Sequence, residues 1–80
     1  MTATAYSIHD RAGFLALTVI ARTPADAARA AEIGCDPTRG PYRMERAPLR
    51  VAREAIAYWR GNFTTDKAVD LTTNEGWEEL

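Results

Sequence analysis

The sequence has few of the residues that build catalytic or metal sites. Its 80 residues include one cysteine, Cys35, and one histidine, His9. A lone thiol forms no internal disulfide and fits a reducing cytoplasm. A metal site needs several ligands on one rigid frame, and nucleophilic catalysis by Cys35 would need His9 and a third, orienting group. No phosphate-binding or dinucleotide-binding glycine pattern is present. We therefore expect no enzyme activity, no metal and no cofactor.

Large apolar side chains are also scarce. Leucine, isoleucine, valine and phenylalanine together number fourteen, whereas alanine alone numbers fifteen. No apolar run approaches the roughly 20 residues of a membrane span, and no basic region precedes an apolar stretch as in a secretory signal. The net charge of −1 argues against disorder. We expect a single, Ala-rich cytoplasmic domain over residues 1–80.

The first third of the chain has the pattern of a β-hairpin. Residues 3–9 and 14–22 alternate, with apolar and β-branched side chains on both faces. Asp10 favours a turn between them, and Gly13 tolerates a positive φ. The sequence therefore predicts a hairpin over residues 3–22.

Two helices are expected after the hairpin. Thr23 as N-cap, Pro24 at the first helical position and Asp26 in the first turn predict a helix over 24–33, with Gly34 at its C′ position. Pro48 starts a second helix over 48–61. Its apolar stripe consists of Leu49, Ala52, Ile56, Trp59 and Phe63.

These elements predict an α+β fold. We expect a small antiparallel sheet built on the N-terminal hairpin, with both helices packed on one face. Further strands are expected near 42–46 and 67–72, and Thr72–Glu75 favours one terminal helical turn.

Charge is unevenly distributed along the chain. Residues 39–60 hold six arginines and two glutamates, a formal charge of +4, whereas residues 61–80 hold one lysine and five acids, −4. Clustered acids can dock on basic, nucleic-acid-binding protein surfaces. In the acidic segment 66–80 we predict five partner-binding residues: Asp66, Asp70, Glu75, Glu78 and Glu79.

Two alternatives use other parts of the chain. A small nucleic-acid-binding module would contact phosphates and bases through Arg43, Arg46, Arg50, Arg53 and Arg60. Against it stand the net charge of −1 and a pI of about 5.7. A self-associating protein would pair the helical stripe with a second copy, giving a homodimer. Tyr58, Trp59 and Trp77 fit either the core or an interface.

The short chain, with no catalytic set, a hairpin-helix frame and segregated charge, resembles the small phage-encoded anti-CRISPR inhibitors. Its Ala- and Arg-rich style, as in Arg22-Thr23-Pro24-Ala25-Asp26-Ala27-Ala28-Arg29-Ala30-Ala31, looks like the product of a GC-rich alphaproteobacterial host. Among the anti-CRISPR inhibitors it looks closest to those of the type I-C Cascade complex. The resemblance implies a stoichiometric blocker in the host bacterial cytoplasm. Such a blocker would bind a Cascade subunit and stop recognition of target DNA, without contacting nucleic acid directly. The group shares no diagnostic residues, so the resemblance assigns none here.

Overall fold

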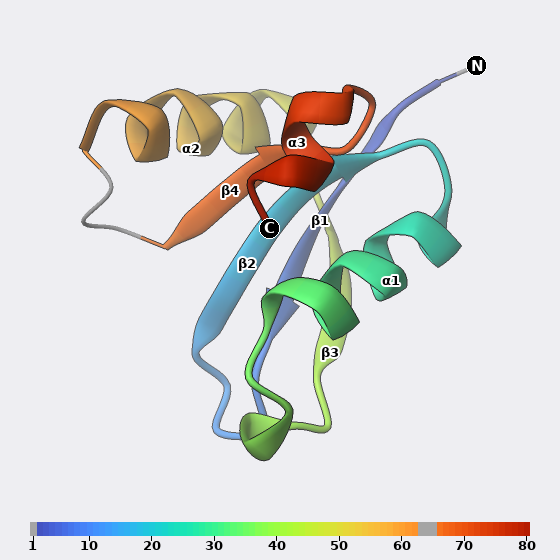
Figure 1. The fold of residues 1–80 in the computed structure, drawn as a ribbon, viewed down its shortest axis with the longest axis vertical. Helices are drawn as coiled ribbons and strands as arrows, with labels where there is room; N and C mark the ends of the chain where they lie inside the picture. Colours follow the sequence, from blue (N-terminus) through green and yellow to red (C-terminus); the bar gives the residue numbers. More distant parts are fainter. Residues whose placement is uncertain (1, 63–65) are drawn as a thin grey trace.

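A four-stranded sheet with helices on both sides forms the centre of the molecule (Figure 1). The computed structural model describes residues 2–62 and 66–80. Along the chain the elements are β1 (Thr4–His9), β2 (Leu15–Ala21), α1 (Pro24–Gly34), the short 3-10 helix η1 (Pro37–Arg39), β3 (Arg43–Ala47), α2 (Leu49–Asn62), β4 (Lys67–Asp70) and α3 (Asn74–Glu78).

The predicted hairpin is confirmed, and Asp10 and Gly13 make its turn. The Asp10 amide donates to the Phe14 carbonyl at 2.9 Å, and the Asp10 carboxylate accepts from the Phe14 amide, also at 2.9 Å. Gly13 has a φ of 91°, a left-handed conformation that glycine adopts without steric cost.

The first helix is confirmed at its start and differs at its end. Thr23 Oγ1 accepts from the Asp26 amide at 3.1 Å, and Pro24 is the first helical residue. Gly34 is not the C′ residue, because it is itself helical and Cys35 is the extended C-cap. A Cβ on Gly34 would lie 3.1 Å from Leu80 Cδ2. The glycine therefore allows the C-terminal residue to approach the helix closely.

The α+β fold class is confirmed, and the two further strands form near their expected positions. The strand order is β3-β1-β2-β4, and β1 pairs antiparallel with both β2 and β3. The prediction of an antiparallel sheet is wrong at β4, which pairs parallel to β2. The reason is that α2 connects β3 to β4 as a crossover between opposite edges, and such a crossover returns the chain to run in the same direction.

The two long helices lie on opposite faces of the sheet, contrary to the prediction of one face. Buried Ala27 and Ala30 of α1 pack with Tyr6 and Ile8, whereas buried residues of α2 pack in a separate cluster. The connection from β2 to β3 and the one from β3 to β4 cross the sheet in opposite directions. Because such crossovers are almost always right-handed, opposite directions place the helices on opposite faces.

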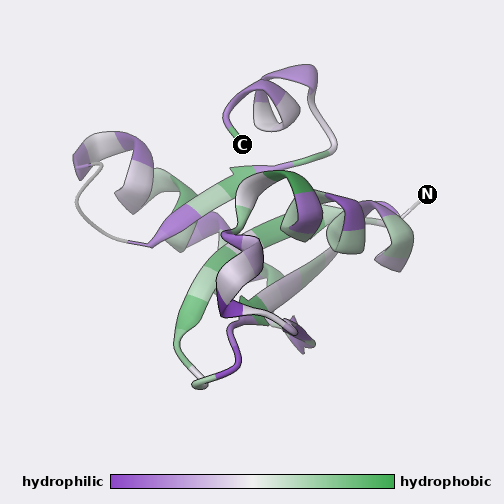
Figure 2. Ribbon diagram, turned by 60° about the horizontal axis from the view of Figure 1, so that its bottom comes forward, coloured by the Kyte–Doolittle hydropathy of each residue, from purple (hydrophilic) through white to green (hydrophobic). Residues whose placement is uncertain are grey.

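The sheet therefore separates two small hydrophobic clusters. The cluster on the α1 side contains Tyr6, Ile8, Leu17, Val19, Ala21, Ala27, Ala30, Val69 and Leu71. The cluster on the α2 side contains Ala5, Ile20, Ala52, Ile56 and Ala68. Figure 2 shows the hydrophobic colour along the central strands and the hydrophilic colour on outer helix surfaces and loops. Side chains alternate between the two faces along β1 and β2, so each face of the sheet carries apolar residues. A helix packs on each face and covers part of these residues.

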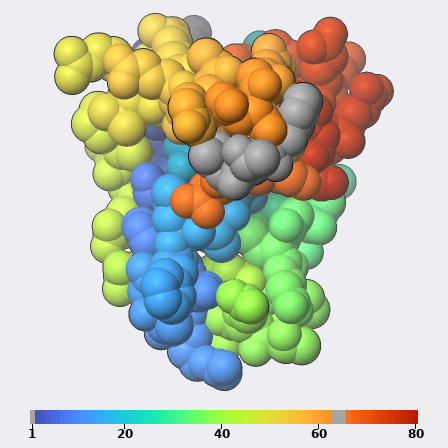
Figure 3. All heavy atoms as spheres, turned by 90° about the vertical axis from the view of Figure 1, so that its left-hand side faces the viewer, coloured from blue at the N-terminus to red at the C-terminus, as the bar shows by residue number. Residues whose placement is uncertain are grey.

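The helix α2 covers only part of its face. In Figure 3 it lies over one end of the molecule, and residues of the hairpin lie uncovered below it. Phe14, at the hairpin end, is 70% exposed. Phe63, the last member of the predicted stripe, lies outside the described residues. Within the described ranges, no helix is long and apolar enough to cross a membrane.

Candidate interaction surfaces

A shallow apolar groove of about 530 Å³ lies between α1 and the edge strand β3. Its walls include Ala28 and Ala31 of α1 on one side and Met44 of β3 on the other, with Ile8 of β1 among the lining residues. The small alanines leave open space here that larger side chains would fill. Met44, on the edge strand, is 37% exposed although it pairs with the buried Ile8.

The segment that follows α1 closes one end of this groove. Asp36 caps η1, because its Oδ1 accepts from the Thr38 amide at 2.9 Å and from Thr38 Oγ1 at 2.8 Å. These two hydrogen bonds hold the pKa of Asp36 below its usual value. Tyr42, another lining residue, donates its hydroxyl to the Asp36 carbonyl at 2.5 Å. The groove therefore has one wall held by side-chain hydrogen bonds.

Cys35 also lines this groove, but its environment opposes activation. Burial raises the pKa of the Cys35 thiol, and the positive charge of Lys67 only partly offsets that effect. A nucleophilic cysteine needs the opposite shift. His9 is not among the groove's lining residues, and its Nδ1 is a buried atom without a hydrogen-bond partner in the described part of the chain. No group of three or more possible metal ligands occurs within the described ranges.

The structure does not bring the five predicted acidic residues together. Asp66 directly precedes β4 and is exposed. Asp70 ends that strand and accepts from the Thr72 amide at 2.9 Å and from Thr72 Oγ1 at 2.6 Å. Glu79 pairs with Arg60 at 3.2 Å. Only Glu75 and Glu78, both on α3, are exposed neighbours. The acidic segment therefore divides into structural and exposed members.

The five predicted arginines are dispersed as well. Arg43 pairs with Glu45 at 3.0 Å. Arg53 and Arg60 line a second groove, between α2 and α3, that also contains Asp70 and Glu75. Arg46 and Arg50 are exposed. Arg53 and Arg60 thus face part of the acidic segment and not a common outer surface.

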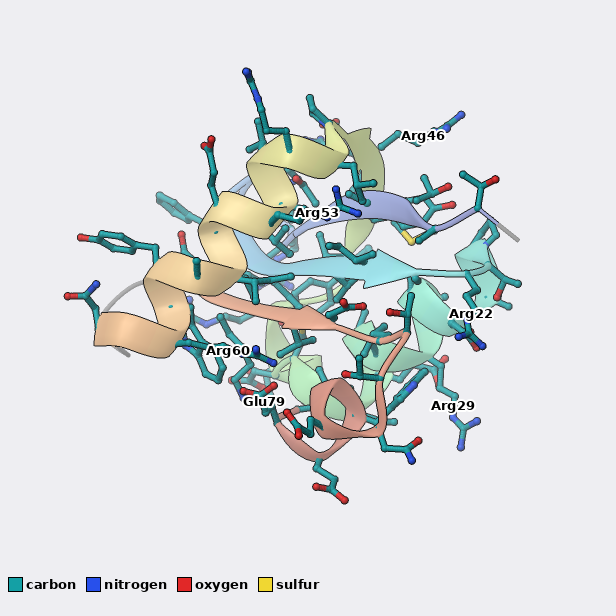
Figure 4. The ribbon with its side chains drawn as sticks, turned by 90° about the horizontal axis from the view of Figure 1, so that it is seen from above. Arg22, Arg29, Arg46, Arg53, Arg60 and Glu79 are labelled. Carbon is teal, nitrogen blue, oxygen red and sulfur yellow. The ribbon has the colours of Figure 1, made fainter. Side chains whose placement is uncertain are left out.

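The fold therefore places part of the basic block against part of the acidic segment. Figure 4 shows the labelled Arg60 of α2 and Glu79, directly after α3, approaching one another, with Arg22, Arg29 and Arg46 on other parts of the molecule. The opposite charges meet because α2 and α3 both pack against β4. Residues far apart in sequence thus neutralise one another, a juxtaposition that local sequence patterns do not reveal.

The tryptophans anchor the elements around β4. Trp77 Nε1 donates to the Leu71 carbonyl at 3.0 Å, and the Arg29 guanidinium lies 5.7 Å from its ring centroid. Trp59 packs against both hydrophobic clusters, and the Lys67 ammonium lies 5.8 Å from its ring centroid. Tyr58, by contrast, is 57% exposed. The two tryptophans are thus mainly structural, whereas Tyr58 is a surface residue.

Comparison of the chain with protein-family models, with curated proteins and with solved structures finds no match.

The sequence does not predict the α1–β3 groove. The alternation of Tyr42 and Met44 in the short strand predicted near 42–46 is the one local signal. It indicates that both side chains point to the same face of an edge strand. What the sequence could not indicate is that β3 pairs with β1 and not with β2.

Proposed function

We propose that this protein is a non-enzymatic inhibitor that acts by binding a protein partner, with α3 as the contact. In this proposal the partner is a basic, nucleic-acid-binding surface on a CRISPR surveillance complex of the Cascade type. The chain occupies that surface and blocks target DNA. The resemblance of the sequence to anti-CRISPR inhibitors supports Cascade as the partner, and the exposed acids of α3 support this helix as the contact.

The observation that carries the proposal is a firmly anchored turn with two exposed acids. Glu75 and Glu78 are exposed on α3, one helical turn apart. Thr73 caps α3 by accepting from the Gly76 amide at 3.2 Å, and the Trp77 indole is bonded to the strand end. Acids held on an ordered element lose less conformational entropy on binding than acids on a loose tail.

The members of the acidic segment have different roles in this proposal. Glu75 and Glu78 contact the partner, and the exposed Asp66 contributes to the negative potential from the other end of β4. Asp70 and Glu79 shape α3 and its link to α2, because their carboxylates already accept hydrogen bonds within the chain.

The test is capture of purified Cascade by the chain, with target-DNA binding by Cascade measured alongside. The double variant Glu75→Gln/Glu78→Gln should weaken capture by roughly tenfold or more and restore DNA binding, since each lost charge contact at such an interface costs about 1 kcal/mol or more. The matched control is Glu32→Gln/Glu54→Gln, which removes the same charge from exposed positions on α1 and α2. Equal capture by all three chains would refute the role of α3, and no capture by the unmodified chain would refute the partner.

A second candidate function is nucleic-acid binding through Arg46 and Arg50. Arg46 and Arg50 lie close in sequence at the β3–α2 junction, and both side chains are exposed. This candidate predicts affinity for duplex DNA that falls steeply with salt and drops in Arg46→Gln/Arg50→Gln. Absence of binding to free DNA at low salt would exclude it.

A further inference from the structure

The outer edge of β3 is open along its length. In the order β3-β1-β2-β4 it is a sheet edge, and residues 43–46 are all exposed. No other described strand pairs with that side of β3. The other edge strand, β4, is covered. The helix α3 contacts it, and Trp59 packs against the hydrophobic clusters on both faces of the sheet. An open edge offers unpaired backbone amides and carbonyls to another strand.

The side chains of β3 alternate between two kinds of surface. Met44 pairs with Ile8 and Arg46 with Tyr6, so both point to the α1 side of the sheet. Glu45 pairs with Ser7, and Arg43 lies two residues before it on the α2 side. The strand thus carries an apolar residue and an arginine on one face and an ion pair on the other.

We propose that the partner for this edge is a second copy of the chain, in antiparallel pairing about a two-fold axis through Met44. In this register Met44 lies opposite its own copy. Arg43 lies opposite Glu45 of the second copy, and Glu45 opposite its Arg43, so two new ion pairs form. Arg46 lies opposite Tyr42 of the second copy, where the guanidinium can stack on the phenol ring. The two four-stranded sheets become one continuous sheet.

Charge complementarity selects this register over its neighbours. Symmetric pairing centred on Arg43, Glu45 or Arg46 would place identical charges directly opposite each other, which destabilises an antiparallel pair. Among the symmetric registers centred on residues 43–46, the one centred on Met44 is alone in opposing no like charges. The same charges that make the edge self-complementary in one register therefore disfavour the others.

The apolar groove supports the same arrangement. A two-fold axis perpendicular to the sheet places the α1 sides of both copies on the same side. The two exposed Met44 side chains then meet beside the two grooves, each lined by Ile8 and Met44. Pairing therefore removes apolar surface from water at the centre of the contact. The α3 ends stay free, since they lie beyond β4 at the opposite edge.

The first test is the mass of the purified chain by sedimentation equilibrium across a concentration series. A dimer is expected, and Glu45→Arg should weaken its association by roughly tenfold or more, because two opposed ion pairs become two repulsive pairs. Arg43→Glu should do the same. The double variant Arg43→Glu/Glu45→Arg should restore the dimer, since the opposite charges are exchanged and not lost. Circular dichroism of each variant confirms that the fold is kept.

A cysteine crosslink tests the register. In a Cys35→Ser background, Met44→Cys should form a disulfide-linked dimer on mild oxidation, because the residue opposes its own copy across the axis. Glu45→Cys is the matched control and should crosslink much more slowly, since its copies lie diagonally across the pair.

Three results would overturn the proposal. The first is a monomeric mass at about 0.5 mM, a concentration at which a dimer with a Kd of about 0.1 mM would be mostly formed. The second is a dimer whose association is unaffected by Glu45→Arg. The third is equal crosslinking at positions 44 and 45. A monomer that instead binds an extended peptide along β3 would assign the edge to another partner. None of these results bears on capture of Cascade, so the two proposals fail separately.

Discussion

Single residues in this protein take their chemistry from their surroundings in the fold. Cys35 and Tyr42 line the same apolar groove. Burial is the largest cause of the raised pKa of each side chain. For Tyr42, the nearby negative charge of Asp36 adds to that effect. A raised pKa keeps the thiol of Cys35 protonated to higher pH, which opposes its action as a nucleophile.

The thiol of Cys35 should therefore react slowly with alkylating agents. We expect the pH profile of its reaction with iodoacetamide to show a pKa above the ordinary value of 9.0. The same chain unfolded in urea serves as control and should show a lower pKa. Because the folded chain holds this proton more tightly, its stability should fall as the pH rises past the pKa of the unfolded thiol. A profile of the folded chain at or below 9.0 would contradict the raised pKa.

The elements of the fold depend on local signals at their ends and on close approach where they dock. The helix α1 begins at an N-cap threonine and a proline, as its sequence indicates. The docking of α3 depends on a contact that has no local signal. A Cβ on Gly76 would lie only 1.8 Å from the Asp70 carbonyl oxygen. Because glycine has no Cβ, α3 can lie directly against the end of β4.

Gly76→Ala should displace α3 from the strand end. We expect a loss of about 1–3 kcal/mol in the free energy of unfolding, because the added methyl meets backbone and not a movable side chain. Gly61→Ala is the matched control, since nothing lies within 4 Å of its Cβ position in α2. That variant should be neutral or more stable by up to about 1 kcal/mol. Urea unfolding measures both, and equal effects at the two positions would argue against a close α3 contact.

At the scale of the whole molecule, one sheet separates two small clusters. Ile8 lies in the cluster on the α1 side and Ile56 in the cluster on the α2 side. Side chains on opposite faces share few contacts, so changes in the two clusters should act independently. The opposite faces follow from the strand order, which makes two crossovers run in opposite directions.

Ile8→Val and Ile56→Val should each cost about 0.5–1.5 kcal/mol of stability, and the double variant should match their sum within about 0.5 kcal/mol. The control pair is Ile8→Val with Leu17→Val, because these two residues are direct cross-strand partners. That pair should depart from additivity by about 0.5 kcal/mol or more. Urea unfolding curves give all the values. Strong coupling between Ile8 and Ile56 would mean that the sheet does not separate the clusters.

The residues of the candidate sites were harder to predict from the sequence than the helices and strands were. Within the acidic segment, Glu75 and Glu78 are exposed neighbours on α3. Asp70 instead accepts a hydrogen bond from the Thr72 amide, and Glu79 pairs with Arg60. Among the arginines, Arg60 pairs with an acid 19 residues later in the chain. A count of charges along a chain does not show which charges neutralise one another, because ion pairs depend on distances in space.

Local patterns in the chain predict where the hairpin, the two long helices and the short terminal helix lie. Those elements follow from alternation, helical spacing, caps and turns, all of which act within a few residues. No local pattern predicts the parallel pairing of β4, the opposite faces of α1 and α2, or the open edge of β3. These features depend on which strands become neighbours. Strand order is set by packing between residues far apart in the chain, and no local pattern records it.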